Sequence, residues 1–223
     1  QRDEIGAIVR DYLIANPEVL EEAFTALQAK REAAEQESRA RALSDSRDKL
    51  FDSDRQAVIG NPDGDVTLVE FFDYNCGYCR RAMDDVMQLV KADENLRVVL
   101  KEFPVLGQAS IEAAQVSIAV NAVAPERFEE FHVRLMGSDA PARDGAVALA
   151  IVDAMGLPRD KVEEAMKAPL VQQTVEEVYG LANALGLTGT PSFVVGDEVV
   201  FGAVGHDVLL ARVNEARCGE ITC

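Results

Sequence analysis

Residues 66–103 carry the pattern that decides the fold: VTLVEFFDYNCGYCRRAMDDVMQLVKADENLRVVLKEF. Val66 to Phe72 is an almost continuous run of β-branched and aromatic residues, typical of a strand buried on both faces. Apolar residues at helical spacing follow Cys79, and Leu96 to Phe103 is a second run of the strand type. A strand, a helix and a strand in this order predict a parallel βαβ unit.

The rest of the chain extends this unit on both sides. A turn at Asn61-Pro62-Asp63-Gly64 precedes the first strand and marks the start of the main domain. Between Ser110 and Gly186 the periodicity is helical, with breaks that separate about four or five helices. Strand-like residues return at 191–195 and 198–201 and predict a β-hairpin, and an amphipathic helix follows Gly205. We therefore predict an α/β domain with a helical insertion.

The first 47 residues predict a separate helical segment. Apolar residues recur at helical spacing on both sides of Asn16-Pro17, which is typical of a helix start, so two helices follow each other. Gln28 to Arg47 has few large apolar residues and predicts a solvated helical spacer. Residues 1–27 are too few to close a core, so their apolar stripe is covered either by the main domain or by another copy of the chain. We favour self-association.

Composition and charge exclude several classes of function. The chain has 223 residues, 48% of them hydrophobic and 27% charged, which indicates a globular protein rather than a disordered one. With 22 basic and 39 acidic residues its net charge is −17, which disfavours nucleic acid and anionic membranes as partners. No apolar stretch approaches the roughly 20 residues that span a bilayer. No signal sequence precedes Gln1, so either the protein is cytosolic or a signal has been removed.

The sharpest chemical signal is Cys76-Gly77-Tyr78-Cys79, where a strand ends and a helix begins. The unpaired N–H groups and the dipole of the helix favour a thiolate on Cys76 and predict that it is the attacking group. Cys79, one turn further, would resolve the mixed disulfide that Cys76 forms. The alternatives are a static disulfide or half of a zinc site. Zinc needs about four ligands, and His132 and His206 do not stand at a ligand spacing with a cysteine.

Two further residues fit a redox site. Pro191 follows Thr190 at the start of a predicted strand, and a cis-proline there would present the preceding backbone to an extended client peptide. The alternative is an ordinary proline that begins a strand. Glu70 interrupts the first apolar strand, so its pKa is expected to be raised and it could move the proton that Cys79 must lose. Its alternative is a residue at the rim of the strand.

These motifs together resemble the thioredoxin-fold disulfide oxidoreductases of the DsbA type, from about Val66 to Val213. The resemblance implies a thioredoxin fold with a helical insertion. It implies four site roles: nucleophile Cys76, resolving cysteine Cys79, cis-proline Pro191 and buried acid Glu70. Within this group, residues 12–20 (YLIANPEVL) resemble the N-terminal segment of the suppressor-of-copper-sensitivity (ScsC) relatives, whose members can oligomerise through it.

The expected organisation has three parts. Residues 1–50 form an N-terminal helical oligomerisation arm and linker. Residues 51–106 and 187–223 form the thioredoxin-fold catalytic domain, and residues 107–186 form the inserted helical domain. A local disulfide between Cys218 and Cys223 is expected to close the chain, with an auxiliary metal or redox pair as the alternative.

The residues around the cysteines narrow the predicted activity. DsbA itself has Pro-His between its cysteines and Val before its cis-proline, whereas Gly77, Tyr78 and Thr190 resemble the disulfide isomerase DsbC and would border the substrate groove. We therefore predict a protein disulfide isomerase or reductase that acts on misoxidised, exported clients. Several active sites around a shared cleft raise the effective concentration of a held client, which suits an oligomerisation arm.

The resemblance also implies a setting and leaves alternatives open. It implies a periplasmic homotrimer whose dithiol is kept reduced by a membrane reductase, with no cofactor, no bound metal and no nucleic acid. A DsbA-like dithiol oxidase is the alternative within the same class. A copper-binding or copper-tolerance protein is the alternative outside it, since two thiolates suit Cu(I).

Overall fold

The computed structural model describes residues 2–223 and divides into two compact units, one ending at Ala42 and the other running from Leu43 to Cys223. Gln1, the first residue of the predicted arm, lies outside the described residues. Among residues 2–223, no helix is both long enough and apolar enough to cross a membrane.

The first unit is helical and leaves its apolar side chains exposed. It contains α1 (Arg2–Ala15) and most of α2 (Glu18–Asp45), and the break between them falls at the predicted helix start. The helix continues through the predicted spacer, where Gln28 and its neighbours are exposed. The large exposed apolar side chains of this unit are Ile5, Ile8, Val9, Tyr12, Ile14, Leu20, Phe24 and Leu27.

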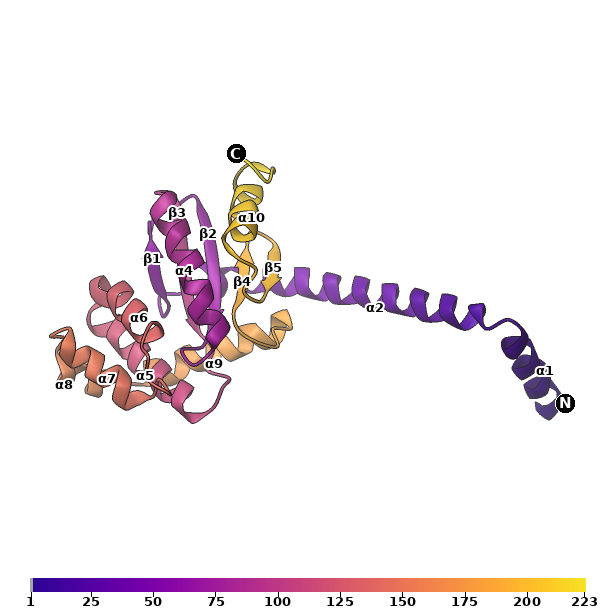
Figure 1. Cartoon of the computed structure of the whole chain (residues 1–223), viewed down its shortest axis with the longest axis horizontal. Coiled ribbons are helices and arrows are strands. Elements are labelled where there is room, and N and C mark those ends of the chain that lie inside the picture. The colour runs from indigo at the N-terminus through magenta and orange to yellow at the C-terminus, as the bar shows by residue number, and fades with distance from the viewer. Residues whose placement is uncertain (1) are drawn as a thin grey trace. The chain divides into compact units, whose positions relative to one another are not determined.

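The second unit is built on a five-stranded sheet of order β1-β3-β2-β4-β5 (Figure 1). The strands are β1 (Ala57–Gly60), β2 (Val66–Phe72), β3 (Leu96–Glu102), β4 (Ser192–Val195) and β5 (Glu198–Phe201). β2 and β3 pair in parallel, with Glu70 opposite Leu100, and the other neighbouring strands pair antiparallel. The predicted βαβ unit and β-hairpin are confirmed.

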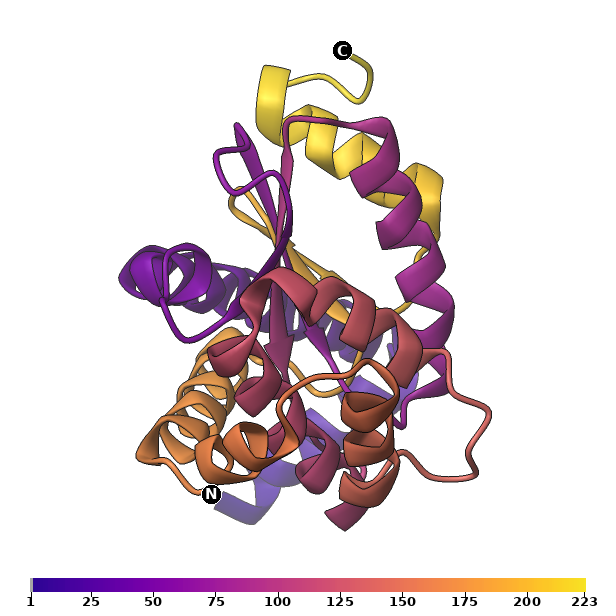
Figure 2. The ribbon, with the colours of Figure 1, turned by 90° about the vertical axis from the view of Figure 1, so that its left-hand side faces the viewer.

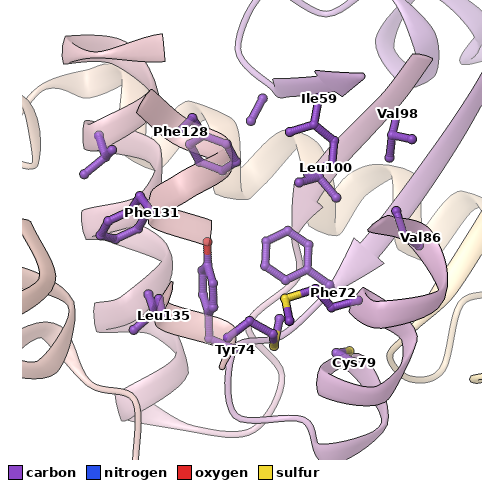
Figure 3. Close-up of a cluster of buried hydrophobic side chains, with 14 of the residues drawn as sticks. Ile59, Phe72, Tyr74, Cys79, Val86, Val98, Leu100, Phe128, Phe131 and Leu135 are labelled. Atoms are coloured by element: carbon purple, nitrogen blue, oxygen red, sulfur yellow. The ribbon is translucent and has the colours of Figure 1, made fainter. Parts of the chain in front are cut away.

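Helices cover both faces of this sheet. α4 (Gly77–Ala92) and α10 (His206–Cys218) lie side by side on one face, as Figure 2 shows. Alternate residues of β2 and β3 point to this face and pack with the apolar stripe of α4; Figure 3 labels Phe72, Val86, Val98 and Leu100 among them. α3 (Arg47–Phe51) contacts β2, and α9 (Pro169–Leu185) contacts β3. The side chain of Lys101, on the alternate face of β3, donates to the carbonyl of Lys49 in α3.

The insertion shares the core of the sheet instead of closing a core of its own. It consists of α5 (Gln108–Val123), the 3-10 turn η1 (Pro125–Arg127), α6 (Phe128–Met136), α7 (Gly145–Ala154), α8 (Arg159–Ala165) and α9. Phe128, Phe131 and Leu135 of α6 belong to the same buried cluster as Phe72 and Leu100 (Figure 3). The insertion therefore reaches the segment that carries the cysteines.

Two features differ from the expectation. β1 was not predicted, because four residues just before a turn carry too little pattern; it pairs with β3 at the edge of the sheet. The second unit also begins at Leu43, before the predicted boundary at residue 50. Leu43, Leu50 and Phe51 are buried, and Arg97 donates to the carbonyl of Phe51, so α3 is part of the catalytic unit.

Candidate active site

The site begins where β2 ends. Residues 73–75 form a short turn, in which the N–H of Cys76 donates to the carbonyl of Asp73, and Cys76 then caps the amino end of α4. Cys76 is 7% exposed, and its Sγ lies 3.2 Å from the carbonyl oxygen of Thr190. Since a buried strand leads into the cap and a buried helix face follows it, the nucleophile is held by rigid elements.

The surroundings of Cys76 favour its thiolate. The thiol of Cys79 donates a hydrogen bond to it, the side chain of Thr190 adds another, and the backbone N–H groups of Tyr78 and Cys79 point at the sulfur. These contacts outweigh the opposing effect of burial and lower the pKa of Cys76 from 9.0 to about 5. At neutral pH Cys76 is therefore ionised and ready to attack a disulfide.

Cys79 is the opposite case. It is fully buried, and its pKa is raised because its thiol donates a hydrogen bond to Cys76, because burial disfavours a thiolate, and because Glu70 adds negative charge nearby. Cys76 and Cys79 are both free thiols. One cysteine is thus prepared to attack, and the other keeps its proton until the first has reacted.

Glu70 is buried rather than placed at the rim of its strand. It is 2% exposed, and it shares a sheet face with Leu68 and Phe72, the face that α4 covers. Burial, and to a smaller extent the charge of Cys76, raises the pKa of Glu70 from 4.5 to about 8. A carboxyl with this pKa can accept and return a proton near neutral pH.

The residues predicted to border the groove lie around Cys76. The Thr190–Pro191 peptide bond is cis, Pro191 is buried, and Thr190 is partly exposed. Gly77 is exposed, and a side chain added there would meet no atom within 4 Å. Tyr78 is 60% exposed, with the Arg81 guanidinium 4.5 Å from the centre of its ring. The surface beside the nucleophile is therefore open.

Asp73 and Asn75 are site residues that sequence reasoning missed. Asp73 Oδ2 accepts the N–H groups of Val105 and Leu106 at 2.9 and 3.0 Å. Asn75 pairs with both backbone groups of Arg143, accepting its N–H at 2.8 Å and donating to its carbonyl at 3.0 Å. The turn before Cys76 thus binds two loops, one that contains Val105 and Leu106 and one that contains Arg143. Asp and Asn side chains readily form hydrogen bonds to backbone groups in turns, so their presence just before Cys76 was the sequence signal that could have indicated this role.

The remaining cysteines and histidines lie apart from this dithiol. Cys218 and Cys223 form a disulfide with an S–S distance of 2.11 Å. His132 is buried in α6, and His206 contacts the carboxylate of Asp207. Within residues 2–223, no cluster of three or more His, Cys, Asp or Glu side chains is arranged to hold a metal.

A dithiol of this kind, on a sheet with this strand order, defines a thioredoxin-fold thiol-disulfide oxidoreductase. More specifically, the chain belongs to the DSBA-like thioredoxin domain family, whose profile matches residues 67–214. A second profile, the copper resistance protein ScsC N-terminal domain, matches residues 1–34. Both predicted resemblances are confirmed.

Solved structures give the same assignment. A thioredoxin-like oxidoreductase from Silicibacter pomeroyi is 44% identical, covers 77% of this chain and 97% of its own, and has a TM-score of 0.73. Proteus mirabilis ScsC in a transitional conformation is 33% identical, covers 97% and 94% of the two chains, and has a TM-score of 0.72.

Curated relatives match over part of the chain. Disulfide bond formation protein D of Bacillus subtilis is 24% identical over 174 residues, which are 74% of this chain and 78% of that protein. The Na(+)/H(+) antiporter NhaA 1 of Salinispora arenicola is 28% identical over 173 residues, which are 75% of this chain but 26% of the antiporter. The chain thus spans about a quarter of the antiporter's length.

Proposed function

We propose that this oxidoreductase acts as a protein disulfide isomerase and reductase on exported client proteins. The observation that carries the proposal is the exposed apolar stripe of the first unit, which includes Tyr12, Leu20 and Phe24. A stripe of this kind fits association with further copies of the chain. Assembly would place several Cys76 thiolates around one client, as isomerisation favours.

The reaction begins with attack by the Cys76 thiolate on a sulfur of a wrong client disulfide. A Cys76–client disulfide forms, and the other client sulfur leaves as a thiolate. In isomerisation a client thiolate then attacks the mixed disulfide, Cys76 is regenerated, and no net electrons are transferred. The open surface at Gly77 and Tyr78 leaves room for the client during these steps.

Reduction follows the second branch of the same scheme. Cys79 transfers its proton to the Glu70 carboxylate, and its thiolate attacks Cys76 Sγ. The client leaves with two reduced sulfurs, and Cys76 and Cys79 become a disulfide. Two electrons must then come from a dithiol reductase in the membrane before the next cycle. Glu70 is near enough to Cys79 for its charge to affect the pKa of that thiol, and this nearness supports the proton transfer.

We place this activity in the periplasm and in a homotrimer assembled through the first unit. The match of residues 1–34 to the ScsC N-terminal domain supports a specialised role for this unit. A structural relative from Salmonella enterica serovar Typhimurium, 27% identical to this chain, is described as a periplasmic thioredoxin-like protein.

The experiment is reactivation of a substrate protein with scrambled disulfides in a redox buffer. We expect the full chain to reactivate it, and Phe24→Glu and a chain that begins at Leu43 to lose this activity by at least 10-fold while still reducing a simple disulfide. Thr25→Glu adds the same charge away from the stripe and should behave as wild type. Equal reactivation by Phe24→Glu and the full chain, with both remaining monomeric in sedimentation, would overturn the proposal.

A dithiol oxidase is the second candidate, because the low pKa of Cys76 favours the reduced dithiol and hence an oxidising pair. Fast oxidation of a reduced client, with no reactivation of a scrambled one by any form, would select it. The copper resistance family matched at residues 1–34 makes Cu(I) binding by Cys76 and Cys79 a third candidate. Reactivation of a scrambled client in the presence of a Cu(I) chelator would separate it from the isomerase, and oxidation of a reduced client under the same conditions would separate it from the oxidase.

A further inference from the structure

Four polar side chains form a continuous hydrogen-bonded series inside the second unit, apart from the dithiol. Ser117 Oγ donates to Glu102 Oε1 over 2.8 Å, and Tyr74 Oη lies 2.8 Å from Ser117 Oγ and 3.2 Å from His132 Nδ1. None is more than 3% exposed. They come from four places: the end of β3, α5, the turn before Cys76 and α6. The series therefore joins the sheet to the insertion.

Apolar rings surround this series and raise the cost of any broken bond. The Phe72 ring meets Tyr74 and His132 edge-on, with centroids 5.0 and 4.9 Å apart, and Phe128 stacks on His132 at 6.0 Å. In Figure 3 the Tyr74 hydroxyl points away from Cys79, toward the helix that carries Phe128 and Phe131. A buried hydroxyl that loses its partner is destabilising, so all three bonds need to be kept in every protonation state.

With Glu102 ionised, the donors can point in only one direction. The carboxylate only accepts hydrogen bonds, so the Ser117 hydroxyl donates to Glu102 and accepts from Tyr74. The single O–H group of Tyr74 already donates to Ser117, so the Tyr74 oxygen accepts a hydrogen bond from His132. Neutral His132 then carries its proton on Nδ1.

With Glu102 protonated, the same three bonds can point the other way. The carboxylic acid donates to Ser117, Ser117 to Tyr74, and Tyr74 to Nδ1 of His132, which then carries its proton on Nε2. A proton that arrives at Nε2 converts the first arrangement into the second. The Nδ1 proton passes to Tyr74, the Tyr74 proton to Ser117 and the Ser117 proton to Glu102, so one proton is gained and every bond is kept.

We propose that Glu102, Ser117, Tyr74 and His132 form a proton-binding site that takes up one proton at His132 Nε2, holds it on Glu102 and reverses all three hydrogen bonds. This proposal does not depend on the isomerase function. It gives the turn before Cys76 and the insertion helices a shared response to pH.

Burial of the series places its titration near neutral pH. Burial raises the pKa of Glu102 from 4.5 to about 7, against the smaller opposing effects of backbone, Ser117 and Lys101. Burial lowers the pKa of His132 to about 4, so the ring stays neutral above that pH and has a defined tautomer. Burial raises the pKa of Tyr74 well above 10.0, and the negative charges of Glu102 and, on the β2 side, Glu70 act in the same direction.

The test is nitrogen NMR of histidine in the full chain, since ¹⁵N shifts distinguish Nδ1–H from Nε2–H. The chain has two histidines, and His206→Gln identifies the signals of His132. We expect His132 to change from mainly Nε2–H below pH 6 to mainly Nδ1–H above pH 8, with a midpoint near the Glu102 pKa of about 7. In Glu102→Gln the tautomer should not change with pH.

Two further variants keep the test decisive. Glu129→Gln removes an exposed carboxyl from the same helix as His132 and should leave the titration unchanged. Ser117→Ala keeps both ends of the series but removes the link, so His132 should again keep one tautomer, and this variant serves if Glu102→Gln does not fold. A wild-type tautomer that is constant from pH 5.5 to 8.5, or the same change in Ser117→Ala, would overturn the proposal.

Discussion

Cys76 and Cys79 lie at the amino end of α4, whereas Cys218 and Cys223 lie at the carboxyl end of α10 and just beyond it. The first two are buried free thiols, and the second two are exposed and joined to each other. A helix favours a negative charge at its amino end and disfavours it at its carboxyl end. The position of each pair on its helix therefore acts together with the hydrogen bond from Cys79, which is the largest effect that lowers the pKa of Cys76.

The comparison also separates two uses of a close cysteine pair. Around Cys76, several hydrogen-bond donors point at one sulfur. Glu70 lies near Cys79, whose proton we propose it accepts. Around the second pair, Arg217 binds Asp65 and Asp93 and fixes the end of α10 to the body of the unit. The first environment prepares a sulfur to react, and the second holds a chain end in place.

The largest expected effect comes from exchanging cysteine for serine in each pair. Cys76→Ser removes the attacking thiolate, so disulfide reduction by the full chain should fall by at least about 10³-fold. Cys218→Ser should leave the rate within about two-fold of wild type, measured by reduction of a simple disulfide. Loss of activity in Cys218→Ser would mean that the second pair takes part in electron transfer.

The next largest expected effect is a difference between the two pairs, after full reduction, in the pH at which their cysteines are alkylated. Since the pKa of Cys76 is lowered to about 5, alkylation at this cysteine should reach half its maximal rate near that pH. Cys218 and Cys223, exposed at a helix carboxyl end that disfavours negative charge, should need a higher pH to react. Mass spectrometry of each alkylated peptide measures both. Equal midpoints would show that helix position does not separate the pairs.

Glu70 distinguishes the first pair further, and its replacement tests the proton transfer. Glu70→Gln should slow the release of a mixed disulfide between Cys76 and a client by roughly 10²-fold, because Cys79 loses its proton acceptor. Stopped-flow measurement of this release is the readout. Glu94→Gln, an exposed carboxyl beyond the end of α4, is the matched control. Unchanged release in Glu70→Gln would assign the proton to another group.

The same variant has a second signature in stability. The pKa of Glu70 is raised from 4.5 to about 8 on folding, so between these values the folded protein binds more protons than the unfolded chain. The free energy of unfolding therefore falls as pH rises through this range. Glu70→Gln should flatten the curve and be more stable than wild type above pH 8, by on the order of a few kcal/mol.

Local sequence patterns predicted the parts that depend on contiguous residues. The buried strand before Cys76, the helix after Cys79 and the hairpin after Pro191 each carry their signal within a few residues. The family resemblance supplied the role expected of Glu70 as a buried acid and the role expected of the N-terminal segment in oligomerisation. The structure confirms the burial of Glu70 and separates a helical first unit from the rest.

What was missed depends on contacts between distant residues. Asn75 meets Arg143 and Tyr74 meets His132 only after the insertion folds against the sheet. In the sequence His132 stands at no ligand spacing with a cysteine, and nothing around it indicates a buried partner. β1 is defined by pairing with β3 more than by its own four residues. Short-range patterns cannot specify such contacts.

The smallest expected effect is the removal of the second pair. Replacing Cys218 and Cys223 by Ala opens a loop of five residues' separation, so the loss of stability should be at most about 2 kcal/mol by loop-closure entropy. It should be smaller still if Arg217 alone holds the end of α10 against Asp65. Denaturant unfolding of the double Ala variant, with and without Arg217→Gln, measures both contributions. A loss well above this limit would show that the disulfide supports the sheet as well as the chain end.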